Sequence, residues 1–285
     1  MEPDKARKTV PLPVIKIITG AFYIPWKRRK RFAIALLVPT TLLLFISAIT
    51  PSLFSAVSNS SYPNTMAAGN GQIIFFDPLS VYTLIAFVLL VVTIVAYLFI
   101  AIAAHRLILQ GDDSVPPYGL KKWTWRETRF IAWCVVIGIV SFFIFLILIM
   151  LLNVFILPFS QEASRQQVLN IVNLIALLPI TYIVSRWALI FPAIAIDERP
   201  GLGSAWELSG RNGWRLVITV GLIPWIFSWI RTTLLGFELT SSFFLFDQLL
   251  VIVALVVEIS LLSLSYQALS VNRAEGAAES ETLRT

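Results

Sequence analysis

The charged residues that lie deepest within long apolar stretches of the sequence are Arg186 and Glu258. If these stretches cross a bilayer as helices, the depths of the two residues differ by only about 6 Å, at roughly 1.5 Å of rise per residue. Leaving either charge unpaired in a membrane costs at least ~2.5–3.5 kcal/mol. We therefore predict that Arg186 and Glu258 form an ion pair inside the membrane.

This predicted pair has two interpretations. In the functional one, the pair is a proton or ion relay, or an anchor for a substrate. In the structural one, it is a buried salt bridge that fixes the packing of two helices. The absence of a second acid or histidine at the same depth in the sequence favours the structural interpretation.

Further polar residues share helix faces with these two charges. Asp247 precedes Glu258 by 11 residues, a whole number of helical turns, so both lie on one face. The stretch that contains Arg186 has a polar face of its own, made of Asn170, Asn173, Thr181 and Ser185. Such faces either line a wet cavity or join helices through hydrogen bonds, and the intervening apolar residues favour hydrogen bonds.

Catalytic and cofactor chemistry has little support in the sequence. His105 is the single histidine and Cys134 the single cysteine, so we expect neither a metal site nor a cofactor. Four acids in the basic loops were considered as ligands of a divalent ion, and solvated loop acids are the commoner case: Asp112, Asp113, Asp197 and Glu198. No motif for nucleotide binding, acyl transfer or metal-dependent hydrolysis is present. We therefore do not expect an enzyme.

The elements that must position these residues are membrane spans. Apolar residues make up 58% of the 285 residues and charged residues 13%, against roughly 45–50% and 25% in soluble domains. A helix that crosses a bilayer needs ~20 apolar residues. Six stretches meet this length and predict an all-α, polytopic bundle over residues 32–270, with spans at about 32–49, 80–104, 130–157, 168–194, 216–235 and 243–270.

The positive charges sort by side of the membrane. All of the 22 Lys and Arg residues except Arg165, Arg186 and Arg231 fall in the N-terminal segment, the C-terminal tail and alternate loops. Basic loops stay in the cytoplasm, so the pattern predicts a multi-pass membrane protein with both termini in the cytoplasm. Because the basic residues flank spans, they do not indicate binding of nucleic acid.

The two ends of the chain are polar. Residues 1–31 form a basic, amphipathic segment that we expect to lie on the cytoplasmic surface of the membrane. Five of its cations would face anionic lipid headgroups: Lys27, Arg28, Arg29, Lys30 and Arg31. Residues 271–285 are rich in Ala and Glu and are expected to form a disordered cytoplasmic tail.

One region resembles a known family. Residues 185–198 read SRWALIFPAIAIDE and are followed by AWELS at 205–209 and NGWR at 212–215. This pattern resembles uncharacterised six-helix bacterial inner-membrane proteins of the YciC-like type, and the membrane domain that precedes some glycerophosphodiester phosphodiesterases. Residues 105–109 (HRLIL) and 125–127 (WRE) are similar to the same group. The resemblance implies a six-span domain without assigned catalytic residues.

Two functions remain open from the sequence. The first is a non-enzymatic membrane protein that supports envelope or lipid organisation, through a membrane-protein partner or a second copy of the chain. The alternative is a small-solute or ion transporter or channel subunit that uses the site at Arg186 and Glu258. A water-filled cavity that reaches Glu258 would favour transport, and a dry, fully paired site would favour the structural role.

Overall fold

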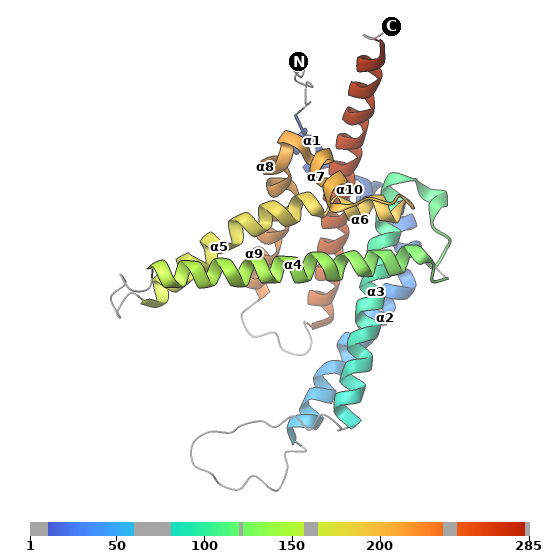
Figure 1. Ribbon diagram of the computed structural model, residues 1–285. Coiled ribbons are helices and arrows are strands. Elements are labelled where there is room, and N and C mark those ends of the chain that lie inside the picture. The colour runs from blue at the N-terminus through green and yellow to red at the C-terminus, as the bar shows by residue number, and fades with distance from the viewer. Residues whose placement is uncertain (1–10, 60–80, 120–121, 157–164, 236–243, 283–285) are drawn as a thin grey trace.

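The computed structural model describes residues 11–59, 81–119, 122–156, 165–235 and 244–282. Every regular element in these ranges is a helix (Figure 1), and none is a strand. Six helical stretches of this part are long and apolar enough to cross a membrane: Arg29–Ser52, Leu84–Leu109, Trp125–Phe155, Ile175–Ala195, Leu202–Thr233 and Leu245–Glu275. The six-span, all-α prediction is confirmed at this level. Residues 80, 157 and 243, at the ends of predicted spans, lie outside the described residues.

The long helices follow one another along the chain. They are α1 (Val14–Lys27), α2 (Arg29–Asn59), α3 (Val81–Leu109), α4 (Trp125–Ile156), α5 (Arg165–Trp187), α9 (Ile223–Leu235) and α10 (Phe244–Thr282). Short elements fill the connections: η1 (Asp112–Ser114), α6 (Ile190–Ala195), α7 (Leu202–Ser209), η4 (Gly210–Asn212), α8 (Gly213–Leu216) and the π-helical η5 (Val217–Leu222).

Helix α10 is the centre of the packing. In the most apolar 18-residue stretch of α10, 56% of the residues are buried. In the corresponding stretch of α4, only 6% are buried. Helices α1, α2, α3 and α9 all contact α10. The core is therefore built around the last span.

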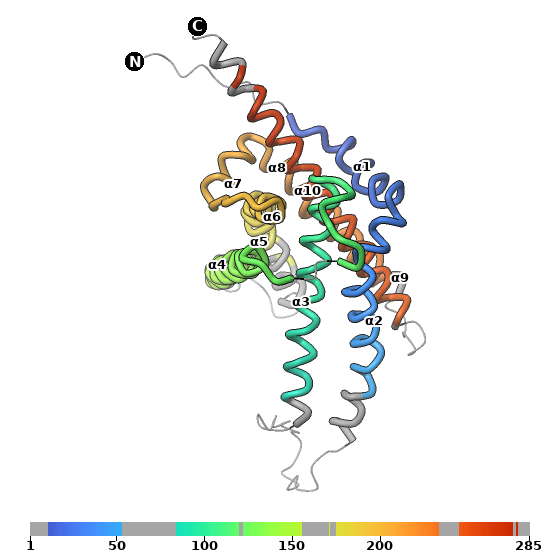
Figure 2. The backbone as a smooth tube through the Cα atoms, turned by 90° about the vertical axis from the view of Figure 1, so that its right-hand side faces the viewer, coloured from blue at the N-terminus to red at the C-terminus, as the bar shows by residue number. Residues whose placement is uncertain are grey.

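Two helical hairpins leave this centre in different directions. Helix α2 packs against α3, and α4 packs against α5; Figure 1 shows the two pairs diverging, and Figure 2 shows α4 nearly end-on while α2 and α3 run downward. Large apolar side chains cover the outside of α4, with Phe142, Phe143, Met150 and Phe155 57–69% exposed. An apolar surface of this extent is stable only in lipid or against a partner. The protein is accordingly a multi-pass membrane protein.

Two predicted spans are interrupted close to the loop that joins them. The predicted span 168–194 splits into α5 and α6, which are separated by a turn at Ala188 and Leu189. The predicted span 216–235 begins with the π-helical η5 before α9. Pro192 accounts for part of the first break, because it has no amide to donate to the carbonyl of Ala188 and its ring crowds that carbonyl.

The ends of the described chain lie on one side of the molecule (Figure 2). Helix α1 packs on α10 through the buried Ile17 and Ala21. The expected disordered tail is instead helical as far as Thr282, as the continuation of α10. Residues 271–282 are rich in Ala and Glu, which are good helix formers, and extending an existing helix carries no nucleation cost.

Candidate functional site

Arg186 lies in the last turn of α5, and its side chain is buried. Its Nε donates a hydrogen bond to the hydroxyl of Ser209 at 2.5 Å, and one Nη donates to the hydroxyl of Tyr182 at 3.2 Å. The other Nη donates to the carbonyl oxygens of Trp206 at 2.7 Å and Gly210 at 3.1 Å. All of these acceptors except Tyr182 belong to α7 and its C-terminal end. The guanidinium group therefore joins α5 to α7.

Aromatic rings complete the surroundings of this cation. The guanidinium carbon of Arg186 lies 3.5 Å from the ring centroid of Trp206 and 5.6 Å from that of Tyr182. Cations are attracted to the faces of aromatic rings, most strongly to Trp. The carbonyls at the C-terminal end of α7 add the negative end of a helix dipole. These acceptors and rings thus stabilise the positive charge of Arg186 without a carboxylate.

The predicted ion pair between Arg186 and Glu258 is not among the ion pairs of the described residues. Glu258 is half-buried and has no hydrogen bond or ion pair in this part of the chain. The physical reason is the break after Trp187. The prediction assumed an unbroken span to residue 194, which would have put Arg186 deep in the membrane; α5 instead ends one residue after it, beside α7.

The predicted polar face of α5 forms a helix contact. The hydroxyl of Thr181 donates to the carbonyl of Leu177 within α5 at 2.8 Å. A Cβ atom on Gly221 would lie 2.5 Å from Cγ2 of Thr181 and 3.3 Å from the hydroxyl of Ser185. This face therefore packs tightly against η5. The side chains of Asn170 and Asn173 lie outside the described residues.

Asp247, predicted to share a lining with Glu258, is held at the far end of α10. Both of its carboxylate oxygens accept hydrogen bonds from Arg231 of α9, at 2.8 and 2.9 Å. The sequence analysis set Arg231 aside as an ordinary basic residue outside the sorting pattern. The structure uses it to tie α9 to the first turn of α10.

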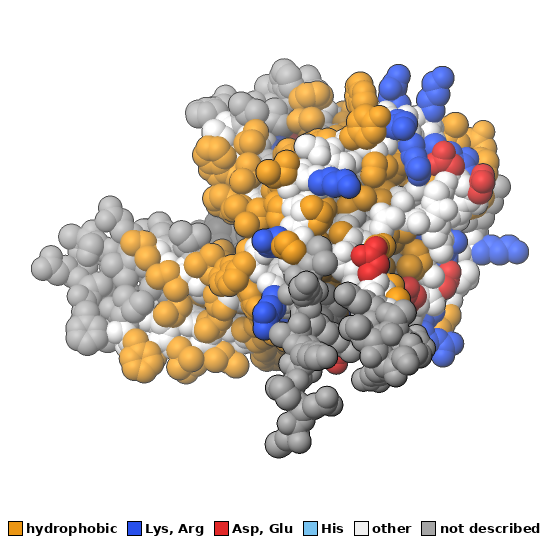
Figure 3. Space-filling model, turned by 90° about the horizontal axis from the view of Figure 1, so that it is seen from above, with side chains coloured by type: hydrophobic (Ala, Val, Ile, Leu, Met, Phe, Trp, Pro, Cys, Tyr) orange, Lys and Arg blue, Asp and Glu red, His pale blue; other side chains and the backbone are white. Residues whose placement is uncertain are grey.

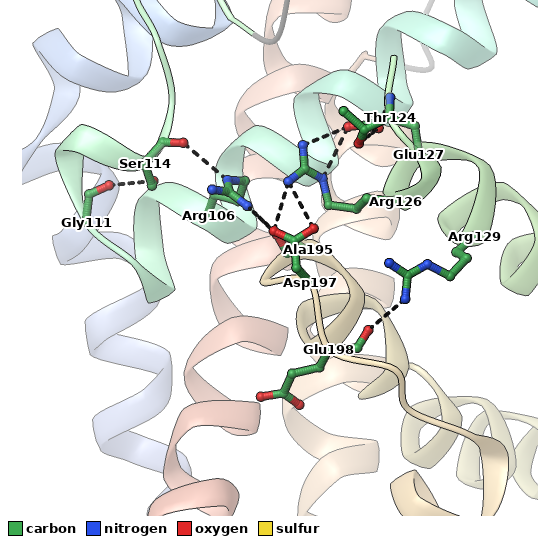
Figure 4. A network of polar contacts seen from close by, with 10 residues as sticks. All are labelled: Arg106, Gly111, Ser114, Thr124, Arg126, Glu127, Arg129, Ala195, Asp197 and Glu198. Atoms are coloured by element: carbon green, nitrogen blue, oxygen red, sulfur yellow. Dashed lines mark hydrogen bonds and ion pairs between the residues drawn. The ribbon is translucent and has the colours of Figure 1, made fainter. Parts of the chain in front are cut away.

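A second charged cluster, which the sequence analysis did not predict, joins three inner segments (Figure 4). Asp197 accepts hydrogen bonds from Arg106 of α3 at 3.0 Å and from Arg126 of α4 at 3.3 Å. Arg126 also forms an ion pair of 2.9 Å with Glu127, which is completely buried. Glu127 in turn accepts hydrogen bonds from the amide and the hydroxyl of Thr124. The cluster fixes α3 and α4 to the turn after α6.

The backbone at Asp197 has an unusual conformation. Its φ angle is 70°, in the left-handed region that residues other than glycine rarely adopt. Its amide donates to the carbonyl of Ile194, and Arg106 donates to the carbonyl of Ala195 at 3.1 Å. Two arginines and the end of α6 thus hold this turn.

The remaining candidate residues also have partners. Nδ1 of His105 lies 2.7 Å from the hydroxyl of Ser263, within hydrogen-bond distance. Glu198 accepts a hydrogen bond of 2.6 Å from Tyr266. No group of acids, histidines or cysteines with metal-site geometry occurs among the described residues. Three of the four loop acids considered as ion ligands, Asp112, Asp197 and Glu198, are engaged by side chains of the protein, and Asp113 is exposed.

The cations expected to face lipid headgroups divide into two groups. Arg28 donates to the carbonyl of Leu107 and forms an ion pair of 3.4 Å with Asp112. Arg31 donates to the carbonyls of Asp112 and Val115. Three of the five stay exposed: Lys27, Arg29 and Lys30.

A sequence signal for the inner cluster existed in part. The acids and arginines concerned lie in the segments that carry the family resemblance: residues 105–109, 125–127 and 185–198. Their charges alternate in sign between loops, but nothing in the spacing states which acid meets which arginine.

Comparisons of the chain with protein-family models, with curated proteins and with solved structures find no match.

Proposed function

We propose that this multi-pass membrane protein is a non-enzymatic organiser of the bacterial inner membrane, which acts through contacts with lipid and with a membrane-protein partner or a second copy. The observation that carries the proposal is the environment of Arg186. Four acceptors and two aromatic rings satisfy this cation within the protein. A residue so occupied serves to hold helices in place.

The other polar groups predicted to line a site with Arg186 and Glu258 support the same conclusion. Thr181 and Ser185 pack against Gly221, and Asp247 pairs with Arg231. Among the described residues, the pocket between α2 and α3 and the pocket between α1 and η5 include neither Glu258 nor Arg186 in their linings. A transport site would need a wet path to at least one of these groups.

The acids of the inner face argue for a scaffold in preference to an enzyme. Asp197 is held by two arginines, Glu127 by Arg126 and Thr124, and Glu198 by Tyr266. A general acid or base must reach a substrate proton, and each of these carboxylates is already engaged by side chains of the protein. The cluster is suited to keeping the inner ends of the spans together.

The outer surface of the hairpin α4–α5 offers the contact area. Helix α4 has the least buried span of the molecule, and Ile139, Phe142 and Ile147 are more than half exposed. These side chains suit lipid or the helix of another membrane protein. The family resemblance seen in the sequence and the positive-inside pattern support placement in the inner membrane with both termini in the cytoplasm.

A deletion strain tests this proposal against transport. The strain is screened for envelope stress and for solute uptake, and is complemented with the wild type or with Glu258→Gln. We expect an envelope phenotype, unchanged uptake, and full complementation by Glu258→Gln. A specific uptake defect that wild type restores and Glu258→Gln does not would overturn the proposal in favour of a transporter, because Glu258 has no partner among the described residues.

A further inference from the structure

A half-open apolar pocket of about 260 Å³ lies between α2 and α3. Its walls include Val38 and Leu42 of α2 and Val95 and Phe99 of α3, and Tyr118 closes one end. Pockets for drug-sized ligands occupy roughly 300–1,000 Å³. The volume and the aliphatic walls fit a segment of one hydrocarbon chain better than a polar solute.

A proline and a glycine create this pocket. Pro39 lacks the amide that would donate to the carbonyl of Ala35, so this carbonyl has no helical partner. Gly119 lies close to this carbonyl oxygen. A Cβ on Gly119 would be 2.9 Å from it, so only a glycine can approach it this closely. The amide of Tyr118 donates to the carbonyl of Ile34 at 3.1 Å. The loop after α3 is thereby fixed across the inner end of the pocket.

The segments that lead into and out of this end of the pocket carry basic residues. Arg31, one turn before Ala35, uses Nε and one Nη to hold the loop, and its second Nη forms no hydrogen bond among the described residues. Lys30 and Lys122 are exposed and have no ion pair in the described part. Figure 3 shows Lys and Arg side chains gathered on the face seen from above, where acids are fewer.

Two acids oppose these cations. The carboxylate of Asp112 is engaged with Arg28 at 3.4 Å. Asp113 is exposed on η1. The positive charges of Lys30, Arg31 and Lys122 outnumber Asp113, the one of these two acids that Arg28 does not engage. The inner end of the pocket therefore complements an anion.

We propose that the pocket between α2 and α3 binds one anionic phospholipid of the inner leaflet. One acyl chain lies between Val38, Leu42 and Val95, and the phosphate lies at the inner end near Lys30, Arg31 and Lys122. Tyr118, 56% exposed at this boundary, suits the headgroup layer, where amphipathic rings are favoured. This inference rests on the proposed function and names the lipid class that the organiser would hold.

The test is native mass spectrometry of the full chain, purified in detergent with equal amounts of phosphatidylglycerol and phosphatidylcholine of the same acyl chains. We expect phosphatidylglycerol to be retained preferentially. Val95→Phe fills the pocket and should abolish this preferential retention. The matched control, Val135→Phe, makes the same change on the exposed surface of α4 and should leave retention unchanged.

The headgroup part of the proposal has its own variants. Lys30→Gln and Lys122→Gln should each weaken phosphatidylglycerol binding about fivefold, without an effect on phosphatidylcholine. Arg211→Gln removes an exposed cation of η4 as the control and should have no effect. Thermal unfolding in detergent checks the fold of each variant. If Val95→Phe does not fold, Val95→Leu makes a smaller change at the same position and is read in the same way.

Equal retention of the two lipids by the wild type, or equal retention by Val95→Phe and Val135→Phe, would overturn the lipid site. Such a result would leave the proposed function standing, since that is read from the phenotype and solute uptake of the deletion strain. Conversely, a Glu258-dependent uptake defect would overturn the proposed function without changing the retention of lipid by the purified protein.

Discussion

Arginine side chains in this protein repeatedly bind carbonyl oxygens at the C-terminal ends of helices. Arg186 binds the end of α7, Arg106 the end of α6, and Arg28 the last turns of α3. The last four carbonyls of a helix lack partners within the helix, and a cation there also meets the negative end of the helix dipole. This recurring contact explains how so many charges are accommodated close to apolar spans.

Substitution of Arg186 tests this account at the level of one residue. Arg186→Gln removes the charged donor to the carbonyls of Trp206 and Gly210 and the cation that packs on the ring of Trp206. We expect the free energy of unfolding to fall by about 1–3 kcal/mol. Glu258→Gln is the comparison, and we expect a much smaller effect because Glu258 has no partner in the described residues. Reversible unfolding in detergent micelles provides the measurement.

The double variant decides whether the two residues interact. If Arg186 and Glu258 are independent, their effects should add to within about 0.5 kcal/mol. A coupling energy above about 1 kcal/mol would show that they form the ion pair predicted from the sequence, and would contradict the contacts described for Arg186.

At the level of helices, close approach at two glycines determines how α5 meets the following segment. A Cβ on Gly213 would lie 2.7 Å from the ring of Tyr182, and one on Gly221 would lie 2.5 Å from Thr181. Small residues allow such close contact between helices in membranes. The contact places the end of α5, and Arg186 with it, beside α7 and η4.

Gly221→Ala should therefore destabilise the protein. The added methyl group has no space beside Thr181 and forces α5 away from η5, with a cost of about 1–3 kcal/mol. Gly138→Ala on α4 is the matched control, because nothing lies within 4 Å of the new Cβ. Thermal unfolding in detergent measures both. Equal unfolding temperatures for the two variants would contradict the close packing of α5 against η5.

The spans were predictable from the sequence, and the contacts of Arg186 were not. Length and apolar content alone determine whether a helix can cross a membrane, so the six stretches could be recognised without any tertiary information. The partners of Arg186 are mainly backbone carbonyls, which every residue type supplies and no pattern reveals. The sequence identifies only acidic residues as possible partners of an arginine. Glu258, the acid at a similar depth, was therefore the predicted partner of Arg186.

The helical tail shows a related limit. Composition predicted disorder for residues 271–285, whereas α10 continues to Thr282 because it extends an existing helix. The inner cluster around Asp197 depends on the left-handed turn after α6, which brings Arg106 and Arg126 to the same carboxylate. Such a meeting of three segments is a property of the tertiary fold.

For the molecule as a whole, the inner and outer ends of the spans differ in how they are joined. Polar contacts connect α3, α4 and the turn after α6 at the inner face (Figure 4), while the hairpins α2–α3 and α4–α5 diverge away from it (Figure 1). The end of the molecule that holds these polar contacts is accordingly the more firmly joined one, and the diverging hairpins expose apolar surface to lipid or to a partner.

The orientation of this end of the molecule can be tested by cysteine labelling. Cys134, the single native cysteine, is exposed on α4 and is first replaced with alanine. A membrane-impermeant maleimide should then label Thr65→Cys in intact spheroplasts. Arg211→Cys, on the exposed side of η4, should react only after the membrane is permeabilised, because basic loops stay in the cytoplasm. Labelling of Arg211→Cys in intact spheroplasts would reverse the orientation and move the basic end of the α2–α3 pocket to the outer leaflet.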